Sequence, residues 1–252
     1  MNRVVVPFHL KGVMLGVGFL FPLLDIINST DYLYYTGLLD EEGRTEFAKR
    51  FDFIRGLVEK TKNYTAAAYL LSHTVLNLRM PGYQSLFEML TGFQHHGSIT
   101  IPQRNKETFA YYSYANSTEF KQIIHVNSSR KLDGTRPQVA AALAAEDFFV
   151  DHKKILQHVL NNTHVLLYTA QLDDVFPVVN IVRQFRNLSW RGSEHFKKAN
   201  RTMWHRGDNT SLELFGYEKR AVTLMYANVL FGGHYVSLDR SYAVSDLYGR
   251  FF

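Results

Sequence analysis

Two polar side chains in the last third of the sequence have the types and placement that acid–base chemistry requires. Asp173 follows the apolar run 165–168, and His234 follows a second apolar run and the pair Gly232-Gly233. A carboxylate that holds an imidazole fixes its tautomer and stabilises its protonated form, so that the ring can take up and return a proton. The two residues could therefore act together as an acid-supported general base.

Strands must bring these two residues together, because they are far apart in the chain. Apolar runs predict strands at 10–17, 164–168, 212–219 and 222–231. Helical spacing and caps predict helices at 41–77, 117–124, 137–148, 151–160, 175–186 and 241–252. The alternation predicts an α/β fold whose core is formed by residues 1–27 and 151–252, with residues 28–150 inserted as a mostly helical cap.

The ends of the predicted strands make Asp173 and His234 candidate site residues. In open α/β sheets, functional groups gather at the carboxyl ends of strands. An acid that precedes the histidine matches the order Ser, Asp, His of an α/β-hydrolase triad. Local chemistry alone also allows simpler roles: an Asp after a strand is commonly a turn former or helix cap, as Asp174 would be, and a His after two glycines is commonly a loop residue.

The residues around this pair resemble those of serine carboxypeptidases. Residues 165–173, VLLYTAQLD, resemble the segment that carries the catalytic Asp in that family, and Gly232-Gly233-His234 resembles the segment with its catalytic His. Further matching segments are LKGVMLGVG at 10–18, YLYYTGLLD at 32–40, Ile124-His-Val126, Trp190-Arg-Gly-Ser, Trp204 and Leu214-Phe-Gly-Tyr217. The likeness covers nearly the whole chain outside residues 78–115, and it is closest to the vitellogenic-carboxypeptidase-like branch.

The resemblance implies an α/β-hydrolase fold, of which this chain would be the C-terminal half of the sheet with its cap. It implies that Asp173 is the catalytic acid, His234 the base, and Tyr235 part of the leaving-group pocket. The nucleophile of the family lies in an elbow before the strand at 10–17, and no Gly-x-Ser-x-Gly occurs in this sequence. We therefore expect removal of C-terminal residues from peptides by the full protein, with no metal or organic cofactor, and no hydrolysis by this chain alone.

Eight of the 14 asparagines begin an Asn-x-Ser/Thr sequon, which indicates glycosylation and passage through the secretory pathway. Cysteine is absent, which by itself favours a reducing compartment, but we give the sequons more weight. The expected protein is accordingly secreted or lysosomal. The sequons begin at Asn28, Asn63, Asn116, Asn127, Asn161, Asn187, Asn200 and Asn209.

Several departures from the family pattern favour a second reading, a secreted carboxypeptidase-like glycoprotein that binds a partner without catalysis. Val17 replaces an Asn, Thr169 and Ala170 replace Asn-Gly, Phe231 replaces a Gly, and the cap cysteines are missing.

Other classes of partner receive little support from the sequence. The net charge of +5 is spread along the chain, which argues against nucleic-acid binding. The apolar run 13–24 is too short to cross a bilayer. His95-His96 has no acidic or thiol companion at metal-binding spacing, so no metal is expected. The oligomeric state stays open, with a homodimer among the options.

Overall fold

The computed structural model describes residues 9–75, 84–104, 108, 110–132, 137–207 and 213–251. These residues form two compact units. The sheet unit contains residues 1–37, 97–99 and 150–252, and the helical unit contains residues 38–96 and 100–149. The sequence placed residues 28–37 in the insertion, whereas the structure assigns them, together with 97–99, to the sheet unit.

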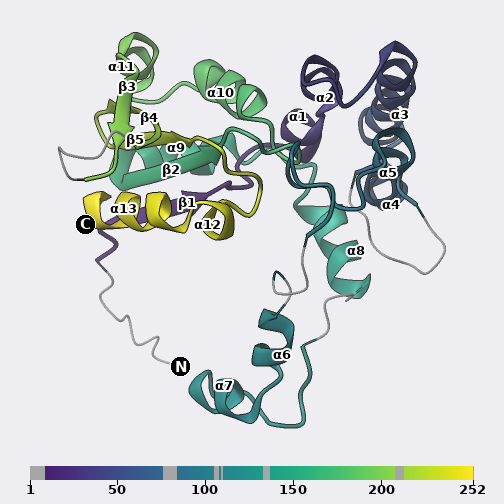
Figure 1. Cartoon of the computed structure of the whole chain (residues 1–252), viewed down its shortest axis with the longest axis horizontal. Helices are drawn as coiled ribbons and strands as arrows, with labels where there is room; N and C mark the ends of the chain where they lie inside the picture. Colours follow the sequence, from purple (N-terminus) through teal and green to yellow (C-terminus); the bar gives the residue numbers. More distant parts are fainter. Residues whose placement is uncertain are drawn as a thin grey trace, which may run out of the picture. The chain divides into compact units, whose positions relative to one another are not determined.

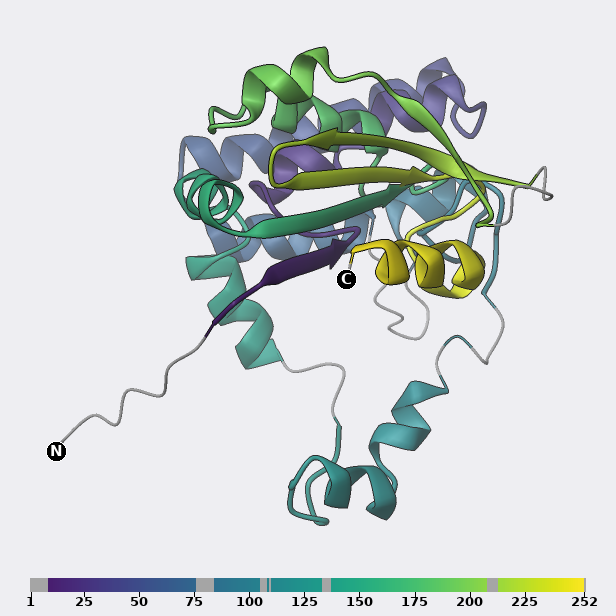
Figure 2. The ribbon, with the colours of Figure 1, turned by 90° about the vertical axis from the view of Figure 1, so that its left-hand side faces the viewer.

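The sheet unit is built on a mixed sheet in the order β1-β2-β5-β4-β3 (Figure 2). β1 pairs with β2 and β2 with β5 in parallel, whereas β4 pairs antiparallel with β5 and β3 with β4. The predicted α/β architecture is thus confirmed, and β3 is a strand that the sequence did not predict. The strands are β1 (Gly12–Gly16), β2 (His164–Ala170), β3 (Thr202–His205), β4 (Leu214–Ala221) and β5 (Leu224–Val229).

Helices cover both faces of this sheet (Figure 1). On one face, α13 packs on alternate residues of β2 and β5 in a buried cluster that includes Leu166, Tyr168 and Leu247. On the other face lie α10 and α11. This two-sided covering explains why β2 reads as a continuous apolar run. The helices of the unit are α1 (Leu23–Ile27), α2 (Thr30–Tyr35), α9 (Lys153–Asn162), α10 (Val178–Asn187), α11 (Ser193–Lys198), α12 (Val236–Asp239) and α13 (Ser241–Phe251).

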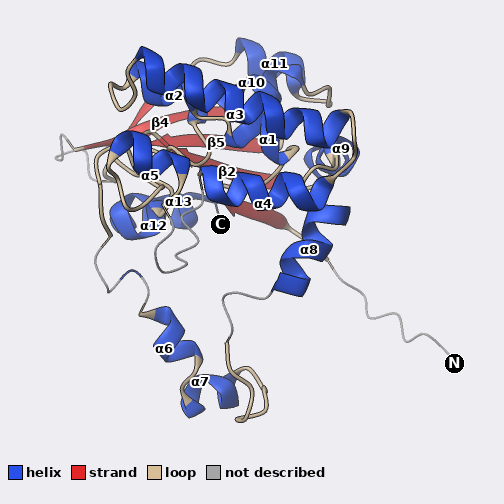
Figure 3. Cartoon of the chain, turned by 90° about the vertical axis from the view of Figure 1, so that its right-hand side faces the viewer, coloured by secondary structure: helices blue, strands red, loops and turns tan. Residues whose placement is uncertain are grey.

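The helical unit is organised around the antiparallel neighbours α3 and α4 (Figure 3). The single helix expected over residues 41–77 is two helices, because Lys62 has a left-handed φ of 54° and Asn63 starts α4 by accepting a hydrogen bond from the Ala66 N–H at 3.1 Å. The helices of this unit are α3 (Glu41–Glu59), α4 (Tyr64–Thr74), α5 (Leu86–Thr91), α6 (Tyr111–Ala115), α7 (Thr118–Ile123) and α8 (Pro137–Glu146).

Candidate active site

The chain leaves β2 along a path that delivers Asp173 to the end of the sheet. Gln171 still donates its N–H to the carbonyl of Val229 at 2.9 Å, and Leu172 donates to the carbonyl of Gly232 at 2.8 Å. The loop after β2 is therefore hydrogen-bonded to the loop after β5. This pairing sets the spacing between Asp173 and His234, because each lies within two residues of a bonded position.

One oxygen of the Asp173 carboxylate stabilises the turn that follows this residue. Oδ1 accepts the backbone N–H groups of Val175 and Phe176, each at 2.9 Å, and the side chain is fully buried. The turn-forming role that local chemistry suggested is therefore present. It occupies only one of the two carboxylate oxygens, so the second is available for another partner.

Two hydrogen bonds hold the backbone of the loop that carries His234. Its backbone N–H donates to the Gly97 carbonyl at 2.6 Å, and the N–H of Gly233 donates to the Asp239 carboxylate at 2.8 Å. A Cβ on Gly233 would collide with the Gly97 carbonyl and the Ser98 side chain, so only glycine fits there. No sequence feature predicted residues 97–99 at this position.

Asp173 and His234 meet at this edge of the sheet. Oδ2 of Asp173 lies 3.2 Å from Nδ1 of His234, and 28% of the histidine side chain is exposed, against none of the Asp173 side chain. The edge of the Phe176 ring contacts the imidazole, with 5.2 Å between centroids. A buried carboxylate on Nδ1 fixes the tautomer that leaves Nε2 unprotonated, and Nε2 can then accept a proton. The arrangement can perform general base chemistry.

A half-buried phenol supports the loop that carries Asp173. Tyr32 of α2 donates its hydroxyl to the Gln171 carbonyl at 2.6 Å. Burial raises the pKa of Tyr32 above its usual range, and the nearby Asp174 and Asp173 carboxylates add to this effect. Tyr32 therefore stays a neutral donor. It belonged to a family-like segment in the sequence, but only the fold places it under the candidate site.

Tyr235 and the substituted positions lie around this pair. The Tyr235 ring is half-buried and edge-on to the His234 ring, with 5.8 Å between centroids. Phe231 donates its N–H to Oε1 of Gln171 at 3.2 Å and has a left-handed φ of 59°. Val17 likewise has a φ of 48°. The family residues that the sequence comparison gave at these two sites, Gly and Asn, tolerate that conformation far better than Phe and Val.

The sequon asparagines differ in how the structure engages their side chains. Asn116 uses both ends of its amide, donating to the Tyr112 carbonyl at 3.0 Å and accepting from the Leu132 N–H at 2.8 Å. Asn28 and Asn161 are half-buried acceptors in local hydrogen bonds. Asn209 lies outside the described residues. The exposed positions are Asn63, Asn127, Asn187 and Asn200.

The described residues offer no candidate for two other kinds of site, a metal centre and a membrane-spanning helix. No group of three or more His, Cys, Asp or Glu side chains is placed to hold a metal ion there, and this includes the surroundings of His95-His96. None of the helices in that part of the chain combines the length and apolar character needed to span a bilayer.

Comparison with known proteins places this geometry in a family. The family model described as serine carboxypeptidase matches residues 2–252. Relatives include the protein of Homo sapiens named probable serine carboxypeptidase CPVL, 27% identical over 98% of this chain, the venom serine carboxypeptidase of Apis mellifera, 27% over 98%, and the vitellogenic carboxypeptidase of Aedes aegypti, 27% over 96%. These matches cover 50%, 51% and 50% of the relatives, so the chain spans about half their length.

A solved structure shares the fold. It is that of Kex1(delta)p, a prohormone-processing carboxypeptidase from Saccharomyces cerevisiae, with a TM-score of 0.60, 14% identity, and coverage of 95% of this chain and 54% of that chain. The expected α/β-hydrolase architecture is thereby confirmed. The chain belongs to the serine carboxypeptidase family.

Proposed function

We propose that Asp173 and His234 are the acid and base of a serine-carboxypeptidase triad. The observation that carries this proposal is the 3.2 Å contact between the buried Oδ2 of Asp173 and Nδ1 of the partly exposed His234. The backbone N–H groups of Val175 and Phe176 hold Oδ1, so the carboxylate cannot rotate away without losing two hydrogen bonds. This geometry supports a role for Asp173 as the group that orients His234.

The mechanism uses each of these groups at a stated atom. Nε2 of His234 takes the hydroxyl proton of a serine as it attacks the scissile carbonyl, and then gives that proton to the leaving amine. The Asp173 carboxylate stabilises the imidazolium that forms. The serine would come from a part of the full protein other than this chain, which has no Gly-x-Ser-x-Gly. Tyr235, beside the imidazole, would line the pocket for the departing residue.

The proposed substrates are peptides and proteins with a free C-terminus, and the proposed setting is the secretory pathway, outside the cell or in lysosomes. The relatives named for venom and for vitellogenic carboxypeptidase support this setting, as do the eight sequons. Binding of a substrate carboxylate next to an acidic side chain is strongest when that acid is protonated, so we expect activity at low pH. No metal or organic cofactor enters the proposed reaction.

A fluorophosphonate probe tests this proposal, because it labels a serine only when a base activates it. The native protein that contains this chain should be labelled, and labelling should fall at least 100-fold in His234→Ala and Asp173→Asn variants of it. The variant Leu238→Ala, at an exposed position of the neighbouring helix α12, is the matched control. Equal labelling in all variants would exclude the proposed roles. The 252-residue chain alone should show no serine-dependent peptide hydrolysis.

The second candidate function is a non-catalytic secreted glycoprotein that binds a partner. The strained Phe231 beside the His234 loop favours it, because an active site under selection is expected to keep the glycine that fits this conformation. Absence of fluorophosphonate labelling in the intact native protein, together with co-purification of a defined secreted partner, would support this candidate over the enzyme. An in-frame Gly-Glu-Ser-Tyr encoded upstream of Met1 would count against it.

A further inference from the structure

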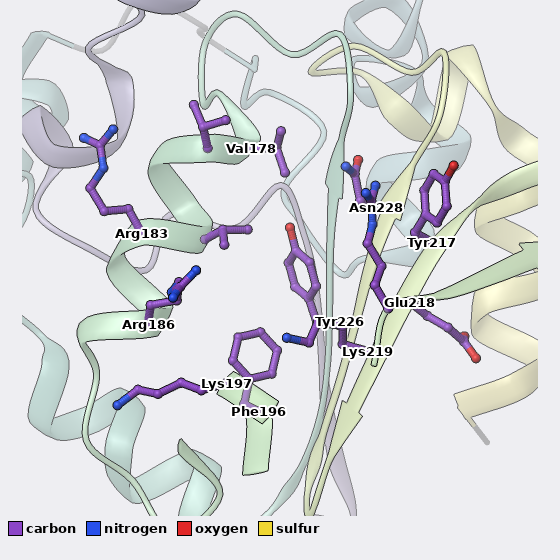
Figure 4. A pocket seen from close by; sticks show the side chains of 13 residues that line it. Val178, Arg183, Arg186, Phe196, Lys197, Tyr217, Glu218, Lys219, Tyr226 and Asn228 are labelled. Atoms are coloured by element: carbon purple, nitrogen blue, oxygen red, sulfur yellow. The ribbon is translucent and has the colours of Figure 1, made fainter. Parts of the chain in front are cut away.

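A cavity of about 650 Å³ lies on the α10–α11 face of the sheet, apart from the Asp173–His234 pair. Its walls come from α10, α11, β4, β5 and Arg201, which precedes β3, and neither Asp173 nor His234 lines it (Figure 4). The strand register places Tyr226 beside Lys219 and Asn228 beside Tyr217 on its floor. The cavity therefore belongs to the sheet unit alone.

The interior of the cavity is apolar and aromatic. Val178 and Val182 of α10 form one wall, and Phe196 of α11 forms another. The ring of Tyr226 lies between them in the middle of the lining (Figure 4), with its centroid 6.0 Å from that of Phe196. The hydroxyl of Tyr226 is occupied by Thr169, at 2.8 Å. A hydrophobic side chain is the group that such an interior accepts best.

Cations without anionic partners surround this interior. Within the described part of the chain, Arg186, Arg201 and Lys219 form no ion pair with a carboxylate. Arg201 instead stacks over the Tyr217 ring at 3.6 Å and Lys219 over the Phe196 ring at 4.7 Å. The pKa of Lys219 is lowered, first by desolvation and then by the charge of Arg186, which indicates that the cations repel one another.

The single carboxylate of the lining does not neutralise them. Glu218 lies on the opposite face of β4 and is bound by Arg250 at 2.7 Å, and its side chain points away from Tyr226 in Figure 4. Lys197, another cation of the lining, forms an ion pair with the Glu194 carboxylate at 2.7 Å. An anion that entered the cavity would therefore meet uncompensated positive charge.

A buried acceptor completes the lining. Oδ1 of Asn228 is buried and accepts no hydrogen bond from any described residue. A buried acceptor left without a donor is unfavourable, and a ligand N–H would recover this loss. The cavity thus offers three complementary features, namely an apolar interior, unpaired cations and an unused acceptor.

We propose that this cavity binds an N-acylated hydrophobic amino acid, which is the chemistry of a peptide's C-terminal residue. Its side chain would enter between Phe196 and Tyr226, its carboxylate would bind the cations Arg201 and Lys219, and its amide N–H would donate to Asn228. The site is separate from the proposed triad and would recognise a peptide C-terminus without cleaving it.

Three small probes separate these features when titrated calorimetrically into the full chain. N-acetyl-L-phenylalanine carries all three groups, its primary amide lacks the charge, and 3-phenylpropanoate lacks the N–H donor. We expect N-acetyl-L-phenylalanine to bind, the primary amide to bind at least tenfold more weakly, and 3-phenylpropanoate several-fold more weakly. Equal binding of the acid and its primary amide would overturn the proposal, as would no binding of any probe.

Matched variants locate the binding. Lys219→Gln should weaken the acid about fivefold or more, whereas Arg220→Gln, on the next residue and without a place in the lining, should not. Val182→Phe should fill the cavity and abolish binding while the thermal unfolding temperature is kept. Asp173→Asn should bind the acid as the wild type does, because the triad is not involved. Loss of binding in Asp173→Asn would refute the site. Binding at the wild-type level in both Lys219→Gln and Val182→Phe would also refute it.

Discussion

Replacement of Asp173 by alanine removes three hydrogen bonds from the loop after β2. The energies of these bonds allow the loss of unfolding free energy to be predicted. Oδ1 accepts two backbone N–H groups at 2.9 Å, and Oδ2 contacts His234 at 3.2 Å. A hydrogen bond to a charged group contributes about 1.5–3 kcal/mol, although removal of a buried carboxylate also regains its desolvation cost. We expect Asp173→Ala to lower the free energy of unfolding by about 2–4 kcal/mol.

Asparagine at the same position separates the turn from the pairing with histidine. Asp173→Asn keeps an oxygen for the N–H groups of Val175 and Phe176, so we expect a loss of about 1 kcal/mol. Its amide N–H₂ would face Nδ1 of His234 and reverse the tautomer. His234→Ala, which removes only the third bond and leaves the buried Oδ2 without that partner, should cost about 1–3 kcal/mol.

Urea unfolding monitored by tryptophan fluorescence measures the free energy of unfolding of these variants. The signal reports on the sheet unit, because Trp190 and Trp204 both lie in it. ¹⁵N spectra of the imidazole report the tautomer of His234. Equal losses for Asp173→Ala and Asp173→Asn would refute the assigned role of Oδ1. An unchanged tautomer in Asp173→Asn would refute the assigned role of Oδ2.

Three further predictions concern backbone strain, a buried phenol and the sequons. Phe231→Gly relieves a φ of 59° and should raise stability by about 0.5–1 kcal/mol in thermal unfolding; a decrease would mean that the conformation is unstrained. Burial raises the pKa of Tyr226 to about 12 although its bond to Thr169 lowers it, so unfolding should become easier between pH 10 and 12, where only the unfolded state ionises. Tyr226→Phe should remove up to about 2–3 kcal/mol of that pH dependence, and identical slopes of stability against pH in both proteins would contradict this. After expression in a secretory host, glycopeptide mass spectrometry should find Asn187 occupied more than Asn116, whose amide is engaged at both ends; the reverse order would contradict the expectation.

The sequence by itself determined the architecture and the identity of the candidate residues. β2 and β5 lie within about two residues of their predicted bounds, because strands covered on both faces leave continuous apolar runs in the sequence. Asp173 and His234 could be singled out because strand ends and flanking residues are local features. The sequence did not predict β3, whose burial pattern has one buried residue among four and so carries little periodic signal.

Only the tertiary structure decided how those residues are held and what else surrounds them. The contacts of Gly97 with His234 and of Tyr32 with Gln171 join residues 137 and 139 positions apart, and no local pattern encodes such pairings. The strain at Val17 and Phe231 depends on backbone angles that the neighbouring strands impose. The cavity beside α10 exists because α10 and α11 pack over β4 and β5, which brings Arg186, Arg201 and Lys219 together. The charge and shape of a site depend on side chains from several segments of the chain, and these side chains come together only in the folded protein.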